Sequence, residues 1–481
     1  MNAPLRYEPG PPPRFADSVR HIAELAWPVF VGQVAVLAFS TIDTVLVARH
    51  ESLDLAALAV GAAAYITIFV GLMGVILSLA PVAGHFYGAG RKAEAGEQLH
   101  QGIWLALIFS VPGCAALLFP EPFLALAKAP PEVAERVRSY LQALAFALPA
   151  SLMFTAFRAF NTAVSRPRVV MFVQIGGLLI KAPLSALLVF GATLPAPTVL
   201  GGPWTVPSLG TPGCGIATAI VLWCQLLAIW RAVKRDPFYE PFHITGRRLS
   251  RLDWTSQRAL LKLGVPMGLS ILVEVTGFTF MAFFISRIGL TPVAGHQIAA
   301  NITALLYMVP LAIANASSTL VAQRIGAEAP RSARRVGWHA IIIGLAMAAV
   351  LGLLLALLRG WIVRLYSQDA AVVAAALPLL VWVAVFHLAD ATQVITSFVL
   401  RAWRVATVPL LIYCISVWGI GLGGGFALAF DAASVTPDSL HGARGFWAAA
   451  TVGLAAAAIA LCGLLAWLMH QQRAQSRREV A

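Results

Sequence analysis

Charged residues are scarce in this chain. Asp, Glu, Lys and Arg make up 11% of its 481 residues, whereas hydrophobic residues make up 59% and the mean hydropathy is +0.81. Soluble globular domains carry charge on roughly a quarter of their residues. The composition therefore excludes a soluble domain and indicates a polytopic membrane protein.

Cysteine is also scarce, and motifs for nucleotide hydrolysis or secretion are lacking. The five cysteines, an odd number without metal-type spacing, lie in or beside apolar runs, where we expect buried packing thiols. Without a Walker-type phosphate loop, energy from nucleotide hydrolysis is not expected. Residues 1–21 are rich in proline and lack the core of a signal peptide, so we expect a flexible cytoplasmic N-terminus.

Long apolar runs recur over the whole chain. A helix of about 20 residues crosses a hydrocarbon core of roughly 30 Å, and twelve runs reach this length. We predict an all-α membrane protein with spans at 22–48, 56–86, 98–119, 132–160, 169–191, 212–233, 263–287, 293–323, 337–360, 373–400, 406–430 and 445–470.

The basic excess follows the loops. Lys and Arg number 34 against 21 acids, a net charge of +13, and they concentrate in alternate loops such as Arg91–Lys92 and the run from Arg231 to Lys262. This bias marks cytoplasmic loops and does not indicate nucleic-acid binding. With twelve spans, both termini are predicted to lie on the cytoplasmic side of the cell inner (plasma) membrane.

The chain is a duplication. Pro28 corresponds to Pro266 and Arg49 to Arg287 at an offset of 238 residues, and other blocks match at nearly the same spacing. Repeats of this kind in an apolar protein are typical of transporters. Six spans per half place the halves in the same orientation, so a pseudo-twofold axis along the membrane normal is expected.

We therefore divide the chain into two six-helix lobes, 22–233 and 263–470. A polar, basic cytoplasmic linker at 234–262 joins them, and 471–481 forms a cytoplasmic tail. The external loop 191–210 carries no charge and is read as an ordered cap or a hairpin. Pro28 and Pro266 lie in the first span of each lobe, where a missing backbone hydrogen bond permits either a hinge or a static kink.

Few ionisable side chains lie well inside the spans: Asp43, Lys181, Glu274, Asp390 and His387. A charge there costs several kcal/mol, so such residues face a cavity, pair or bind a cation, unless they snorkel to an interface. A carboxylate in an apolar medium can bind and release a proton near neutral pH. His387 either shares a proton with Asp390, three residues later, or makes a helix-contact hydrogen bond.

Aromatic and sulfur-containing side chains offer contacts to a cationic compound. Tyr65, Phe69, Tyr307 and Met308 either line a cavity through stacking and cation–π contacts or pack between helices. The pair His296–Gln297, polar where lipid contact is expected, either lines the same cavity or joins helices.

Several of these residues lie in motifs that resemble the NorM-type branch of the MATE (multidrug and toxic compound extrusion) transporters. The motifs include Ile42-Asp43-Thr44-Val45, Gly264-Val265-Pro266-Met267-Gly268 with Glu274, and Asp390-Ala391-Thr392-Gln393-Val394, and the likeness extends over roughly 20–470. The resemblance implies export of organic cations in exchange for sodium or protons. It also implies that Asp43 is the coupling acid of the N-terminal lobe and that Glu274 and Asp390 are the cation-site acids of the other.

The fifth span departs from the family pattern Asn-x-Pro-Leu-Asn/Asp, because it reads Lys181-Ala182-Pro183-Leu184-Ser185. The resemblance places this helix beside the first span, so Lys181 is expected either to act as a built-in counter-ion to Asp43 or to snorkel to an interface. In the first case the ammonium would take the place of a sodium ion.

These observations predict a secondary antiporter that exports amphipathic, cationic compounds by alternating access, not an enzyme. It needs no cofactor, is coupled to protons or sodium and works as a monomer in the lipid bilayer. The alternatives are a lipid-precursor flippase of related fold and a polytopic membrane enzyme acting on lipids. The expected residues are, for ion or proton coupling, Asp43, Lys181, Ser185, Thr218, Glu274 and Asp390, the last two also for sodium; for the substrate cavity, Tyr65, His296, Gln297, Tyr307, Met308, His387 and Gln393; and for hinges, Pro28 and Pro266.

Overall fold

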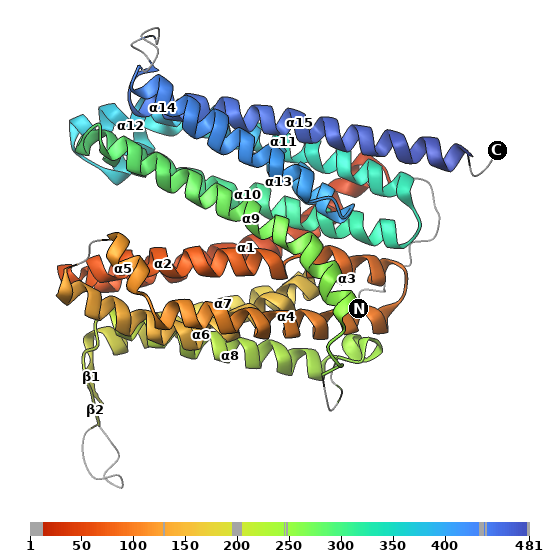
Figure 1. The fold of residues 1–481 in the computed structure, drawn as a ribbon, viewed down its shortest axis with the longest axis horizontal. Coiled ribbons are helices and arrows are strands. Elements are labelled where there is room, and N and C mark those ends of the chain that lie inside the picture. Colours follow the sequence, from red (N-terminus) through yellow and green to blue (C-terminus); the bar gives the residue numbers. More distant parts are fainter. Residues whose placement is uncertain are drawn as a thin grey trace. The chain divides into compact units, whose positions relative to one another are not determined.

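The protein is almost entirely helical (Figure 1). The structure, a computed structural model, describes residues 13–127, 130–194, 204–244, 246, 249–431, 437 and 440–478. Twelve helical segments in these ranges are long and apolar enough to span a membrane. Helices suit this setting because they satisfy every backbone polar group internally where water is absent.

The chain divides into two compact units. Unit 2 comprises Val31–Tyr87 and Arg91–Gly264, and unit 1 comprises the remainder. The elements of unit 2, together with α1, which belongs to both units, are α1 (Phe15–Ala48), α2 (Ser52–Ile76), α3 (Leu79–Gly88), α4 (Lys92–Leu118), α5 (Glu121–Ala127), α6 (Pro131–Ala163), α7 (Pro167–Phe190), β1 (Ala192–Leu194), β2 (Trp204–Val206), α8 (Thr211–Arg235) and η2 (Pro237–Phe242).

Unit 1 contains the second series of spans. Its elements are α9 (Trp254–Ser286), whose first turns belong to unit 2, α10 (Leu290–Gly326), α11 (Pro330–Tyr366), α12 (Ala370–Ala402), α13 (Thr407–Cys414), η3 (Ile415–Gly423), α14 (Gly424–Ala429) and α15 (Ala443–Arg478). The segment η3 is a π-helix that continues α13 into α14 and thus completes the eleventh span.

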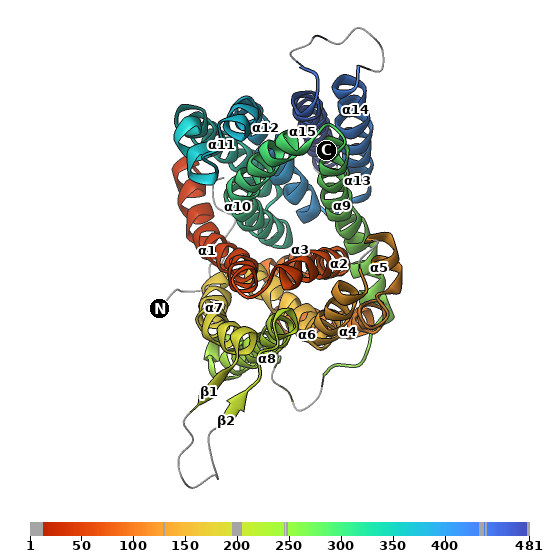
Figure 2. The ribbon, with the colours of Figure 1, turned by 90° about the vertical axis from the view of Figure 1, so that its left-hand side faces the viewer.

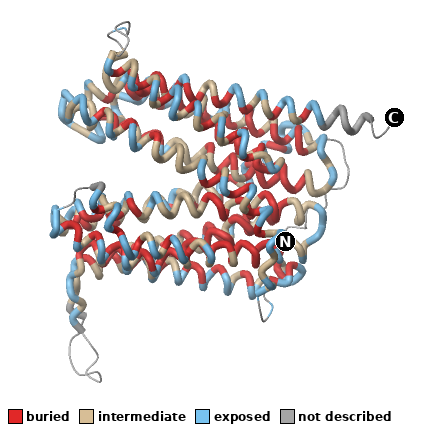
Figure 3. The backbone as a smooth tube through the Cα atoms, in the orientation of Figure 1, coloured by how far each residue is buried: buried red, intermediate tan, exposed pale blue. Residues whose placement is uncertain are grey.

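Each unit is built around the fourth span of its series. In unit 2, α6 packs against α2, α4 and α8, and in unit 1, α12 packs against α10, α11 and α15. Buried residues concentrate along both central helices (Figure 3). The equivalent role of α6 and α12 agrees with a duplicated sequence.

The spans lie where the apolar runs predicted them, but several are longer. Helix α11 has 37 residues, about 55 Å at 1.5 Å per residue, which exceeds the hydrocarbon thickness. Helix α1 begins at Phe15, so the expectation of a flexible segment up to residue 21 was wrong from Phe15 onward; residues 1–12 lie outside the described ranges. Of the loop 191–210, expected as an ordered cap or a hairpin, the described residues include the antiparallel strands β1 and β2, which project beyond α7 and α8 (Figure 2); residues 195–203 lie outside the described ranges.

The expectation for the cysteines was only partly correct. Cys214 is buried, whereas Cys224 is exposed and Cys114, Cys414 and Cys462 are half-buried; all five are free thiols. Cys224 lies on α8 next to Trp223 and near Leu227, which are both exposed. This side of the helix therefore faces away from the core of unit 2, and the Cys224 thiol lies on it.

The segment that joins the two series of spans is held tightly against α4. Trp104 Nε1 donates to Ser250 O at 2.9 Å, His100 Nδ1 lies 2.7 Å from Ser250 Oγ, and Gln101 Nε2 donates to Arg251 O at 2.8 Å. The described residues of the polar linker expected at 234–262 therefore belong to unit 2, and α9 begins among them, at Trp254.

The short helix η2 docks on the ends of α6 and α7. Tyr239 donates its hydroxyl hydrogen to Asn161 Oδ1 at 2.5 Å, and burial raises the pKa of Tyr239 above its usual range. Arg166 pairs with Asp236 at 3.3 Å and lies over the Phe238 ring at 4.0 Å. These contacts keep the end of α8 close to the rest of unit 2.

Candidate functional site

A buried ion pair lies inside unit 2. Lys181 Nζ on α7 is 2.9 Å from Asp43 Oδ2 on α1. Lys181 is 0% exposed and Asp43 7%, so both residues are buried and Lys181 does not snorkel. Because burying a charge costs several kcal/mol unless it is paired and hydrogen-bonded, this contact determines which charge states the site can adopt.

All three donors of the Lys181 ammonium are used. Besides Asp43, Nζ donates to Thr218 Oγ1 at 2.6 Å and to Cys214 O at 3.2 Å, both on α8. Ser185, one turn after Lys181, donates to the other carboxylate oxygen of Asp43 at 3.1 Å. An ammonium has three hydrogens and no acceptor, so the site is complete for a charged lysine beside an ionised aspartate.

Two glycines bring α8 close enough for this geometry. A Cβ on Gly213 would lie 2.6 Å from Leu188 O on α7, and one on Gly215 would lie 3.0 Å from Tyr140 O on α6. Between these two glycines lies Cys214, whose carbonyl accepts from Lys181. The close approach of α8 to both helices thus depends on residues without a side chain.

The structure brings four of the predicted coupling residues into one cluster: Asp43, Lys181, Ser185 and Thr218. It adds the Cys214 carbonyl and Tyr140, whose side chain interacts electrostatically with Asp43, neither of which we expected to take part. The run Gly213-Cys214-Gly215 was a signal of close helix packing, but it did not show which carbonyl would point inward.

The second pair of predicted acids lies in unit 1. Glu274 on α9 and Asp390 on α12 are close enough for their charges to interact. Glu274 also interacts with the Tyr413 side chain and with the Arg401 guanidinium. Asp390 is 3% exposed.

A π-helical turn packs against α9 beside Glu274. Trp418 Nε1 in η3 donates to Val273 O at 3.2 Å, and a Cβ on Gly277 would lie 2.7 Å from Val417. π-Helical segments are rare and frequently occur at functional sites. The sequence did not predict this one, because a local change in hydrogen-bond register leaves no mark in the hydropathy pattern.

The remaining predicted residues are dispersed. His387 is buried, and neither of its ring nitrogens has a hydrogen-bond partner among the described residues, so it does not share a proton directly with Asp390 here. His296 packs on the Trp447 ring at 5.9 Å, and Gln393 is buried, whereas Gln297 is exposed.

The predicted aromatic contacts divide between the units. Tyr65 stacks on Phe69 with ring centroids 5.6 Å apart in unit 2. Tyr307 and Met308, on α10 of unit 1, are half-buried. Tyr307 interacts with both Glu274 and Asp390.

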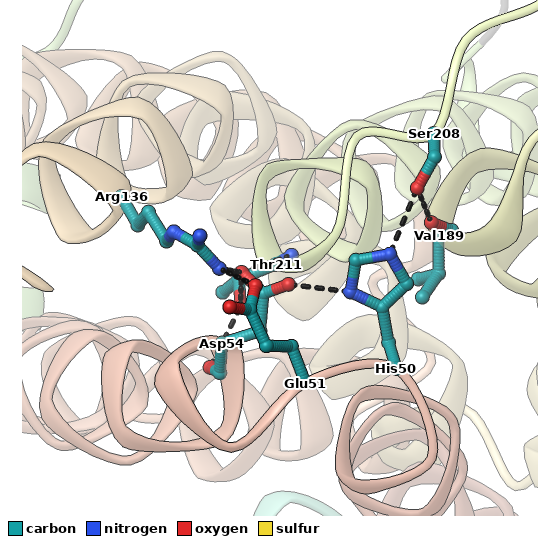
Figure 4. A network of polar contacts seen from close by, with 7 residues as sticks. All are labelled: His50, Glu51, Asp54, Arg136, Val189, Ser208 and Thr211. Carbon is teal, nitrogen blue, oxygen red and sulfur yellow. Dashed lines mark hydrogen bonds and ion pairs between the residues drawn. The ribbon is translucent and has the colours of Figure 1, made fainter. Parts of the chain in front are cut away.

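A second polar cluster in unit 2 was not predicted (Figure 4). His50 follows α1, and its Nδ1 lies 2.6 Å from Asp54 Oδ2 in the first turn of α2. Arg136 on α6 is 2.8 Å from Asp54 Oδ1 and 2.7 Å from Glu51 Oε2. In the sequence this cluster shows only as an acid four residues after a histidine, a spacing too common at the corner between two helices to indicate a site.

This cluster also reaches the ends of α7 and α8. Ser208 Oγ lies 2.8 Å from His50 Nε2 and donates to Val189 O at 2.7 Å. Thr211 donates its hydroxyl hydrogen to Asp54 O at 2.7 Å. Ligand atoms of His50, Glu51 and Asp54 lie within 4.8 Å of one another, but Arg136 already pairs with both acids, so we do not assign a metal to them.

Comparisons with known proteins show a family match. A model of the MatE family matches residues 28–187 and 266–426, two segments that begin at the two prolines 238 residues apart. Over 98% of both chains, the sequence is 38% identical to the "Probable multidrug resistance protein NorM" of Aromatoleum aromaticum. It is 32% identical to the multidrug resistance protein PmpM of Pseudomonas aeruginosa, over 94% of this chain and 92% of that protein.

Solved structures share the fold. The crystal structure of the eukaryotic MATE transporter AtDTX14 matches with a TM-score of 0.81 at 19% identity, covering 97% of this chain and 100% of that one. The Vibrio cholerae MATE transporter VcmN in its bent form matches with a TM-score of 0.81 at 18% identity, covering 96% and 98%. The predicted all-α fold with twelve membrane helices is confirmed.

Proposed function

The chain belongs to the MATE transporter family, and we propose that it is a secondary antiporter that exports amphipathic, cationic organic compounds by alternating access. The relatives named as multidrug resistance proteins support this class of substrate. The observation that carries the proposal is the buried pair of Asp43 and Lys181, a charged site inside an apolar helix bundle.

In unit 2 we propose that coupling runs on protons. The Lys181 ammonium is bound to the carboxylate oxygen of Asp43 at which a sodium ion would otherwise bind. Its three hydrogens are donated to Asp43, Cys214 O and Thr218. A proton, in contrast, can bind to Asp43 itself. It would neutralise the carboxylate, leave the buried ammonium without its counter-charge and so favour a rearrangement of α1 against α7 and α8.

In unit 1 we propose that Glu274 and Asp390 form the second coupling site. Two nearby carboxylates in an apolar medium repel each other when both are ionised, so the pair favours holding a cation or a proton. If sodium is the ion there, these two side chains would hold it, and Arg401 limits the negative charge available to it.

The prolines are proposed as hinges. The border between the compact units falls in α1 between Phe30 and Val31, two residues after Pro28, and in α9 between Gly264 and Val265, directly before Pro266. A proline lacks the N–H that would close the helical hydrogen bond and so lowers the cost of bending at that place.

For substrate contact we propose Tyr65 in unit 2 and Tyr307, Met308 and Gln393 in unit 1, with His296, Gln297 and His387 as further candidates. Aromatic faces attract organic cations. We also propose the inner membrane as the location, with both termini in the cytoplasm, because the basic residues concentrate in the loops on that side.

The test is efflux of a fluorescent lipophilic cation in everted membrane vesicles, with pH and sodium gradients imposed separately. We expect a proton gradient to drive transport. If neither gradient drives transport, an antiporter is excluded. Movement of a fluorescent lipid across the bilayer without transport of the organic cation would favour a flippase instead.

A further inference from the structure

The hydrogen bonds around His50 fix where its protons lie. A serine hydroxyl has one hydrogen, and Ser208 uses it on Val189 O, which can only accept, at 2.7 Å. The contact of 2.8 Å between Ser208 Oγ and His50 Nε2 must therefore be donated by the histidine. His50 consequently carries a hydrogen on Nε2.

The other ring nitrogen faces a carboxylate. His50 Nδ1 lies 2.6 Å from Asp54 Oδ2, and without a hydrogen between them two acceptors would face each other. Arg136 lies 2.8 Å from the other carboxylate oxygen, and the Thr211 amide donates to it at 3.3 Å. Both contacts stabilise the ionised form of Asp54, so the hydrogen belongs to Nδ1.

We propose that His50 is a proton-binding site, held as an imidazolium between Asp54 and Ser208 (Figure 4). Its proton joins the corner between α1 and α2 to the ends of α7 and α8. These helices, except α2, also carry Asp43, Lys181 and Thr218, but the proposal does not depend on their role.

The charges facing this site balance only when the proton is bound. Helix α2 and its N-cap supply Asp54 and Glu51, α6 supplies Arg136, and the chain before α2 supplies the exposed Arg49, which has no contact in the cluster. The ends of α7 and α8 contribute Val189, Phe190, Ser208 and Thr211, which are uncharged. With the proton, two cations face two anions inside the cluster; without it, one negative charge is left in excess.

Loss of the proton should therefore release one connection. A neutral imidazole has a single N–H, so it can donate to Asp54 or to Ser208 but not to both.

The direct test is nitrogen NMR of the full chain labelled at histidine. The signals of His50 are identified by their loss in His50→Gln, with His243→Gln, at an exposed position, as the matched control. If His50→Gln does not fold, Ser208→Ala identifies the same signals by shifting them. We expect both ring nitrogens of His50 to be protonated at pH 7. One unprotonated ring nitrogen at that pH would overturn the proposal.

A second readout follows the released connection. Hydrogen exchange of the segment from Trp204 to Thr211 should be about tenfold faster in His50→Gln than in the wild type, because the contacts of the imidazolium to Asp54 and Ser208 are lost together. In His243→Gln protection should follow the wild type. Equal protection in His50→Gln and in the wild type would contradict the proposal.

Discussion

Removal of the Lys181 ammonium should be costly, because Asp43 would be left buried without a counter-charge. Breaking a buried pair by removing one partner typically costs about 3–5 kcal/mol, because an uncompensated charge remains. Lys181→Met keeps an unbranched side chain that is one atom shorter, and it removes the charge and the hydrogen-bond donors. We expect a loss of stability in this range.

The matched control is Lys262→Met, which removes the same group from an exposed position on α9; its effect should lie within about 0.5 kcal/mol of zero. The double variant Asp43→Asn with Lys181→Met removes both charges and should recover most of the loss. Thermal unfolding in detergent, followed by tryptophan fluorescence for all variants, gives the comparison. If Lys181→Met is no more destabilising than Lys262→Met, the reasoning about the buried pair is refuted.

Three further predictions concern the other acids and the hinge. Replacing Glu274 with Gln or Asp390 with Asn should abolish gradient-driven efflux and leave the protein folded in the membrane; full efflux by both variants would exclude this site. Pro28→Ala should slow turnover more than it weakens substrate binding, and unchanged rates and binding would mean that Pro28 is a static kink. The carboxylate of Asp253, before α9, accepts hydrogen bonds from Ser256 and Thr255, which lower its pKa. Its contribution to stability is therefore present above the usual value of about 3.9 and is lost as the pH falls through the lowered pKa; a carbon NMR titration midpoint at or above the usual value would contradict this.

The membrane helices were predictable because an apolar run long enough to cross a bilayer can form few structures there other than a helix. Their ends were less predictable, since α1 continues to Phe15 and α11 to Pro330 through polar turns that hydropathy does not detect. The π-helix at Ile415–Gly423 left no pattern to find.

The pairing of Asp43 with Lys181 depended on a specific departure from the family pattern. Lys181 stands where an amide is usual, and a cation in a span needs an anion nearby. The cluster of His50, Asp54 and Arg136 was missed for the opposite reason. These residues lie near the ends of spans, where charged side chains are common, and only the fold shows that Asp54 is buried.

The most direct test of the central claim, that Lys181 takes the place of a coupling sodium ion, is efflux from liposomes containing the wild type or Lys181→Asn. Proton and sodium gradients are applied separately to each. We expect efflux by the wild type to be driven by the proton gradient through the Asp43–Lys181 site of unit 2. Efflux by Lys181→Asn should lose its coupling to protons or become dependent on sodium. Strong sodium dependence of the wild type that is unaffected by Lys181→Asn would contradict the claim.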